Sequence, residues 1–121
     1  MSSALVITVD GTVAELEWPA AGPDGEHPSI LHFMYRMMGC DTVDVVRLAP
    51  GLDMWLDDYG MGLQPVNPLA TMLARAFGYM SQPYYGTVLL SGVDGFESVG
   101  LSPRKVMAAR RFLNSISGVL L

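Results

Sequence analysis

The sequence has 121 residues, half of them hydrophobic, and 7 basic against 12 acidic side chains give it a formal net charge of −5. A chain of this length makes one domain, here residues 1–121, and its acidic balance argues against a general affinity for nucleic acid or anionic membranes. The single cysteine, Cys40, excludes an internal disulfide and a cysteine-based metal cluster.

The charges are unevenly placed along the chain. Residues 1–100 hold all 12 acidic side chains, whereas residues 101–121 hold four basic side chains and no acidic one. The start, MSSALVITVDG, lacks the basic segment of a signal peptide, and no apolar run approaches the about 20 residues that a membrane-spanning helix needs. We therefore expect a cytoplasmic protein without a membrane segment and with a basic C-terminal region.

The N-terminal part of the sequence has the pattern of a β-hairpin followed by a loop. Two β-rich runs, about residues 4–9 and 12–18, flank Asp10-Gly11, a pair that suits a two-residue type I′ turn. The segment 19–28 is rich in proline and glycine and predicts a loop.

A short helix is predicted over residues 29–39. Ser29 can cap its start, and Gly39 can end it. The apolar side chains share one broad face of this helix, and His32 and Arg36 lie together on the other side.

Two strands are predicted next, over residues 42–48 and 52–58, joined by a turn at APG. In the second strand Leu52, Met54 and Leu56 form one face. The opposite face holds Asp53, Trp55 and Asp57. The carboxylates of Asp53, Asp57 and Asp58 could bind a cation or act as acid and base, but their spacing favours a solvated edge.

The stretch QPVNPLATMLARAFGYM, residues 64–80, predicts a second helix. Pro68 fits the first helical position, where its missing N–H costs nothing, and Asn67 then lies at the N-cap. The predicted buried stripe comprises Leu69, Met72, Leu73, Ala76, Phe77 and Met80, and the opposite side holds Thr71, Arg75 and Tyr79.

The last part of the chain predicts a hairpin over residues 87–101, with a turn at Asp94-Gly95, and then a basic helix at about 103–116 that Ser102 caps. The complete order is ββ-α-ββ-α-ββ-α. Hairpins outnumber parallel crossovers in this order, so we predict a single compact α+β domain with a mostly antiparallel sheet and three helices.

Six residues are candidates for ligand binding. The adjacent rings of Tyr84 and Tyr85 can stack on a planar ligand, or they can plug the end of the sheet without one. His32 and Arg36, with Tyr35 beside them, can hold a phosphate or carboxylate, although an ordinary solvated helix side has the same pattern. Two further candidates, which can form a cation–π pair or a plain surface, are Arg75 and Tyr79.

The basic helix is a candidate surface for nucleic acid or an acidic partner through Arg104, Lys105, Arg110 and Arg111. It can equally be a solvated face that complements the acidic body of the same chain or of a second copy. Two histidines and scattered acids predict no metal site. Cys40 follows a helix end, where the helix dipole raises a thiol's pKa, so we predict no catalytic cysteine and no cofactor.

Four stretches, taken in order, carry a resemblance: MMGCDTVDVVRL, LDMWLDDYGMGLQPVNPLATML, GTVLLSGVDG and GLSPRKV. They resemble an uncharacterised domain family of small proteins from bacteriophages, plasmids and actinobacteria. That family shows an N-x-x-A-T helix start, here Asn67 with Ala70 and Thr71, followed by a G-x-v-v-l-x-G strand, here Gly86 to Gly92. The resemblance spans about residues 29–105 and implies an accessory protein of a mobile element, but it supplies no catalytic residues.

These observations favour a small non-enzymatic binding protein. It would occupy a host defence protein or sequester an anionic small molecule such as a signalling nucleotide. Wide apolar faces and nine methionines favour a homo-oligomer. The alternatives are a nucleic-acid-associated protein that uses the basic helix, and a small enzyme.

Overall fold

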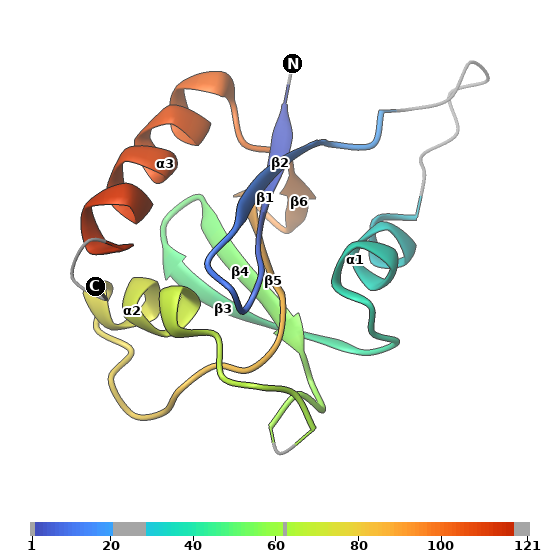
Figure 1. The fold of residues 1–121 in the computed structure, drawn as a ribbon. Coiled ribbons are helices and arrows are strands. Elements are labelled where there is room, and N and C mark those ends of the chain that lie inside the picture. The colour runs from blue at the N-terminus through green and yellow to red at the C-terminus, as the bar shows by residue number, and fades with distance from the viewer. Residues whose placement is uncertain (1, 21–28, 62, 118–121) are drawn as a thin grey trace.

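The structure, a computed structural model, describes residues 2–20, 29–61 and 63–117. These residues form six strands and three helices in the predicted order ββ-α-ββ-α-ββ-α (Figure 1). The elements are β1 (Ser3–Ile7), β2 (Val13–Glu17), α1 (Ile30–Met38), β3 (Val43–Ala49), β4 (Leu52–Asp57), α2 (Pro68–Ala76), β5 (Val88–Asp94), β6 (Glu97–Val99) and α3 (Pro103–Ser117). Most of the predicted loop 19–28, including His27, lies outside the described residues.

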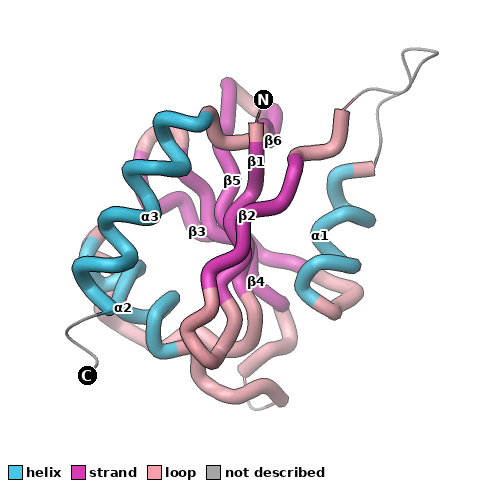
Figure 2. The backbone as a smooth tube through the Cα atoms, turned by 45° about the horizontal axis from the view of Figure 1, so that its top comes forward, coloured by secondary structure: helices cyan, strands magenta, loops and turns pink. Residues whose placement is uncertain are grey.

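The strands form one sheet in the order β2-β1-β5-β4-β3, and β6 pairs with the end of β5. Every pairing between named strands is antiparallel. Helices α2 and α3 cover one face of the sheet and α1 covers the other, so the molecule has three layers (Figures 1 and 2). The predicted α+β class with an antiparallel sheet is confirmed.

Each face of the sheet has its own hydrophobic core. On the α2–α3 side, Leu5, Ile7 and Leu90 of the central strands pack against Leu73 and Leu113 of the helices. On the other side, Val6 and Leu89 pack against Phe33 and Met34 of α1, and Trp55 lies at the margin. Because successive side chains of a strand point to opposite faces, central strands covered on both sides are apolar at nearly every position.

The turn between β1 and β2 differs from the prediction. A type I′ turn needs positive φ at both central residues, but Gly11 has φ 88° and no non-glycine residue of the described chain has positive φ. The Gly11 N–H donates to the Thr8 carbonyl at 3.0 Å, and the Thr8 N–H donates to Thr12 at 3.0 Å. The loop is therefore longer than two residues, with glycine at its left-handed position, which is why both strands are shorter than predicted.

The start of α2 is tied to the sheet by Asn67, which has no exposed surface. Its Oδ1 accepts from the Ala70 N–H at 3.0 Å, as predicted for an N-cap. Its Nδ2 donates to the carbonyls of Ile7, at 3.0 Å, and Gly86, at 2.8 Å. Asn67 thus joins α2 to β1 and to the segment that leads into β5.

Thr71 continues this connection, and here the predicted orientation of α2 is wrong. Thr71 was predicted to lie opposite the buried stripe, but it is 7% exposed. Its Oγ1 donates to the Asn67 carbonyl and accepts from the Tyr84 N–H, both at 2.9 Å. The helix also ends at Ala76, before Gly78 with φ 96°, so Met80 lies beyond it and is 68% exposed.

Candidate functional site

An apolar pocket lies between α2, α3 and the turn that joins β3 to β4. Its volume is about 290 Å³, near the lower end of the range for small-molecule sites. The floor comes from Leu90 of β5 and Leu101, which are fully or almost fully buried. The remaining lining residues are Ala49, Pro50, Gly51, Leu52, Leu73, Phe77, Lys105, Ala108, Ala109 and Phe112.

One wall of the pocket is the turn between β3 and β4. Ala49 pairs with Leu52, which leaves Pro50 and Gly51 as the two turn residues. Gly51 has φ 80°, and a Pro-Gly pair suits a type II turn, in which proline fixes the first φ and glycine supplies the positive one. This wall is therefore held in place by local backbone geometry.

The opposite wall is α3, whose pocket side follows helical spacing from Lys105 through Ala108 and Ala109 to Phe112. The two alanines leave space that larger side chains would fill. Phe112 meets Phe77 of α2 with ring centroids 5.9 Å apart. Each of these two rings is 38% exposed, and together they form an apolar rim.

Among the residues that the structure describes, Lys105 is the one charged residue that lines the pocket. Its Nζ lies over the β3–β4 turn, 3.2 Å from the position that a Cβ on Gly51 would occupy. Within the described ranges no carboxylate lies within 4.0 Å of this ammonium group. The pocket thus combines an apolar interior with a single cation that no described acid neutralises.

The two adjacent tyrosines lie at a different place. Tyr84 is 4% exposed and belongs to the core of the α2–α3 face, and burial raises the pKa of its phenol. Tyr84 and Tyr85 line a small polar hollow of about 120 Å³ together with Asp44, Asp57 and Asp58. The carboxylates make this hollow unfavourable for an anion, and little of the Tyr84 ring is free to stack on a ligand.

His32, Tyr35 and Arg36 lie on α1 as predicted, and the His32 and Tyr35 ring centroids are 6.0 Å apart. Tyr35 and Arg36 line an open groove of about 690 Å³, whose other lining residues are Gly39, Cys40, Asp41, Asp57, Tyr59 and Leu63. Two rings and a guanidinium group suit a planar anion. The two aspartates in the same groove repel one.

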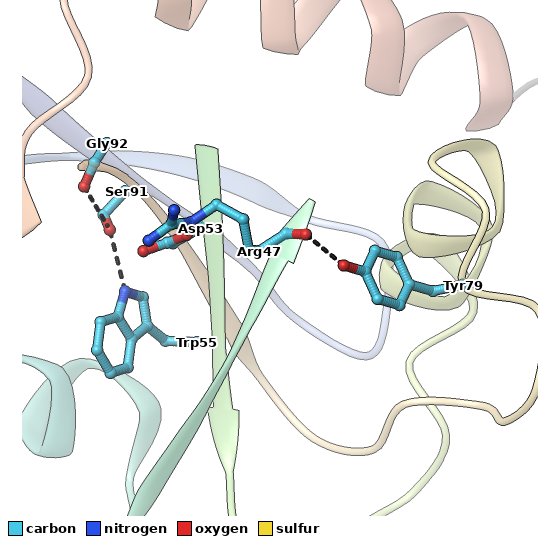
Figure 3. Close-up of polar contacts among 6 residues, drawn as sticks. All are labelled: Arg47, Asp53, Trp55, Tyr79, Ser91 and Gly92. Carbon is cyan, nitrogen blue, oxygen red and sulfur yellow. Dashed lines mark hydrogen bonds and ion pairs between the residues drawn. The ribbon is translucent and has the colours of Figure 1, made fainter. Parts of the chain in front are cut away.

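Arg75 and Tyr79 do not lie one turn apart on a helix, because α2 ends between them. The Tyr79 hydroxyl instead donates to the backbone carbonyl of Arg47 in β3 at 2.5 Å (Figure 3). Tyr79 therefore ties the segment after α2 to the sheet, and Arg75 is exposed. The six candidate ligand residues are thus spread over separate places on the molecule.

The predicted solvated edge of β4 is wrong for Asp53, which is 3% exposed. Its carboxylate accepts from the Arg47 guanidinium on the neighbouring strand, and the Trp55 Nε1–H donates to Ser91 Oγ at 3.0 Å (Figure 3). The Ser91 hydroxyl in turn donates to the Gly92 carbonyl at 3.2 Å. Asp53 and Ser91 are buried, Trp55 is partly buried against the α1 core, and the Arg47 side chain that pairs with Asp53 is itself exposed.

The four cations of α3 point in different directions. Arg110 lies 3.9 Å from Glu15 of β2, and Lys105 lies over the β3–β4 turn. Arg104 and Arg111 line an open surface with Met107 between them. Of the four cations in the predicted basic surface, Arg104 and Arg111 therefore share one open surface, and Lys105 and Arg110 lie elsewhere on α3.

Cys40 is half-buried next to Gly39, which ends α1 with φ 66°. Burial, followed by the nearby Asp57 carboxylate, raises the pKa of the Cys40 thiol. In the part of the chain that the structure describes, no three His, Cys, Asp or Glu side chains are grouped so that they could hold a metal ion. No described helix has the length and apolar character to cross a membrane.

The fold defines a small three-layer α+β domain with an antiparallel sheet and an apolar pocket under its last helix. The chain belongs to a family characterised as a domain of unknown function (DUF3846), which matches residues 1–114. The match extends further in both directions than the motif resemblance, which spans about 29–105. No curated protein and no solved structure matches the chain.

Sequence reasoning missed the pocket because its walls come from segments far apart in the chain. A signal was nevertheless present in α3. Ala108 and Ala109 lie between Val106 and Phe112, and small residues on the inward side of an amphipathic helix leave room between the helix and its neighbour.

Proposed function

We propose that this protein is a non-enzymatic binding protein that holds a small molecule in the pocket between α2, α3 and the β3–β4 turn. The single observation that carries the proposal is an apolar pocket of about 290 Å³ in a domain of 121 residues. Small-molecule sites are concave and mostly apolar, and they often lie between helices. This pocket, open on one side and lined almost entirely by apolar residues, has that character.

Binding would be driven by burial of apolar surface. Leu73, Leu90 and Leu101 offer the ligand an apolar interior, and Phe77 and Phe112 would cover it at the rim. Removing apolar surface from water contributes roughly 25 cal/mol per Å². Among the described residues that line the pocket, Lys105 is the one ionisable side chain, so no described nucleophile–base pair faces a ligand there.

The role in a cell would be sequestration, as the resemblance to mobile-element accessory proteins implies. A small protein that binds without turnover acts in proportion to its amount, so it would need to be abundant relative to its ligand. The pocket volume of about 290 Å³ lies at the lower end of small-molecule sites. It therefore favours a ligand smaller than a nucleotide.

The test is to fill the pocket with a larger side chain and measure whether the protein still binds a small apolar probe. Ala109→Leu adds three carbon atoms to the pocket wall, and Ala76→Leu makes the same change on the exposed end of α2, outside the pocket. Binding of eight-carbon probes, octanoate and octanamide, would be measured at pH 7 by isothermal titration calorimetry. We expect binding to wild type and to Ala76→Leu and none to Ala109→Leu.

The stability of the two variants separates occlusion from misfolding. Because Ala109→Leu fills empty space, its melting temperature should equal or exceed that of wild type, whereas overpacking a filled core costs about 1–3 kcal/mol. Equal binding of the probes to Ala109→Leu and wild type would overturn the proposal, as would failure of both probes to bind wild type.

A further inference from the structure

We infer that the ligand of this pocket is a small amphiphilic monoanion, with an apolar body and one carboxylate that pairs with Lys105. The inference rests on the proposed function and names its ligand class. It follows from the size of the pocket, from the chemistry of its lining and from the position of one ammonium group.

The lining favours an apolar body. Apart from Lys105, the side chains that line the pocket are those of alanine, proline, glycine, leucine and phenylalanine. Such side chains give no hydrogen bonds to a sugar, a base or a peptide group, and burying those groups unpaired is costly. A hydrocarbon chain or ring leaves no polar group unpaired.

The position of Lys105 favours a single negative charge at one end of that body. Its ammonium group lies at the β3–β4 turn, at the edge of the apolar lining, and the described residues place no carboxylate within 4.0 Å of it. One cation can balance one carboxylate. A dianionic phosphate would bring a second charge into a protein that already carries −5.

The place of Lys105 at the edge of the pocket suits a long, flexible side chain that ends in a charged group. The stem of a lysine can lie along apolar surface while its ammonium group stays in water, and Lys105 is exposed. An anionic headgroup held there would keep part of its hydration, while the hydrocarbon body enters between Leu73 and Leu101. The geometry is that of an amphiphile inserted tail first.

The experiment compares two probes of equal size and different charge. Octanoate and octanamide are closely matched in size and differ in charge, and both are small molecules of the kind that a pocket of about 290 Å³ suits. Their affinities at pH 7 would be measured by calorimetry for wild type, Lys105→Met, Lys105→Arg and Arg104→Met. Arg104→Met is the matched control, because it removes one charge from the neighbouring position of α3, and Arg104 does not line the pocket.

We expect wild type to prefer octanoate by about five-fold, the equivalent of one partly exposed ion pair. Lys105→Met should abolish that preference by weakening octanoate alone, Lys105→Arg should retain it, and Arg104→Met should leave it unchanged. Equal affinity of wild type for both probes would overturn the inference, as would an equal loss of octanoate binding in Arg104→Met. If wild type binds neither probe, the proposed function itself fails, and that result differs from a loss of charge preference.

Discussion

Asn67 has two separable roles, and substitution can measure each of them. As an N-cap it accepts one hydrogen bond from the first turn of α2. Its side-chain amide also donates to the carbonyls of Ile7 and Gly86, and these two hydrogen bonds tie α2 to the sheet. Loss of an N-cap costs about 1 kcal/mol. Each buried polar group left unpaired costs about 1–3 kcal/mol more.

We therefore expect Asn67→Ala to lower the free energy of unfolding by about 3 kcal/mol, taking the low end for each carbonyl. Ser102→Ala is the matched control, because Ser102 caps α3 by accepting from the Lys105 N–H at 3.3 Å and is exposed. Its expected cost is about 1 kcal/mol or less. Both values come from urea unfolding monitored by circular dichroism.

A second substitution tests the two hydrogen bonds that the Asn67 amide donates to the sheet. Asn67→Asp keeps the acceptor that caps α2, but it replaces the donating amide with an oxygen that faces the carbonyls of Ile7 and Gly86. It should be at least as destabilising as Asn67→Ala at pH 7. Two results would show that these hydrogen bonds do not stabilise the fold. One is Asn67→Asp as stable as wild type, and the other is Asn67→Ala lowering the free energy of unfolding no more than Ser102→Ala.

Two further changes follow from the buried polar contacts. Thr71→Val removes the hydroxyl that joins Asn67 to Tyr84, so it should lower the free energy of unfolding in urea by about 1–3 kcal/mol. Thr71→Ser keeps a hydroxyl and should recover most of that loss. Equal stability of Thr71→Val and wild type would contradict this. The raised pKa of Cys40 keeps its thiol protonated near pH 8. Iodoacetamide should therefore alkylate the folded protein more slowly than the urea-unfolded chain. Asp57→Asn should increase the alkylation rate of the folded protein and leave that of the unfolded chain unchanged. An unchanged folded rate in Asp57→Asn would remove that carboxylate as a cause.

The sequence predicted best those features that depend on neighbouring residues. Ser29, Gly39 and Asn67 lie at the helix ends where they were expected, because capping is decided within a few positions of the chain. The alternation of β4 likewise predicted which side chains share a face. Turn type was less certain even locally, because an Asp-Gly pair fits turns of more than one length.

Features that depend on packing between distant segments could not be predicted in the same way. Asp53 looked solvated because one face of a half-buried strand normally is exposed to water. Its burial and its ion pair with Arg47 depend on how β4 packs beside β3 and β5. Thr71 looked exposed because it is polar, but its hydroxyl bonds two backbone groups, one of them 13 residues away. The pocket depends on the distance between α3 and the β3–β4 turn, and no local pattern encodes that distance.

The central claim is that the pocket under α3 binds a small molecule, and methyl NMR tests it most directly. Leu73, Leu90 and Leu101 place methyl groups in the pocket lining, whereas Leu63 lines the separate groove on the α1 side. With octanoate added, we expect nuclear Overhauser effects between the ligand chain and the three pocket leucines, and none to Leu63. Contacts to Leu63 alone, or none to any of the four, would contradict the account.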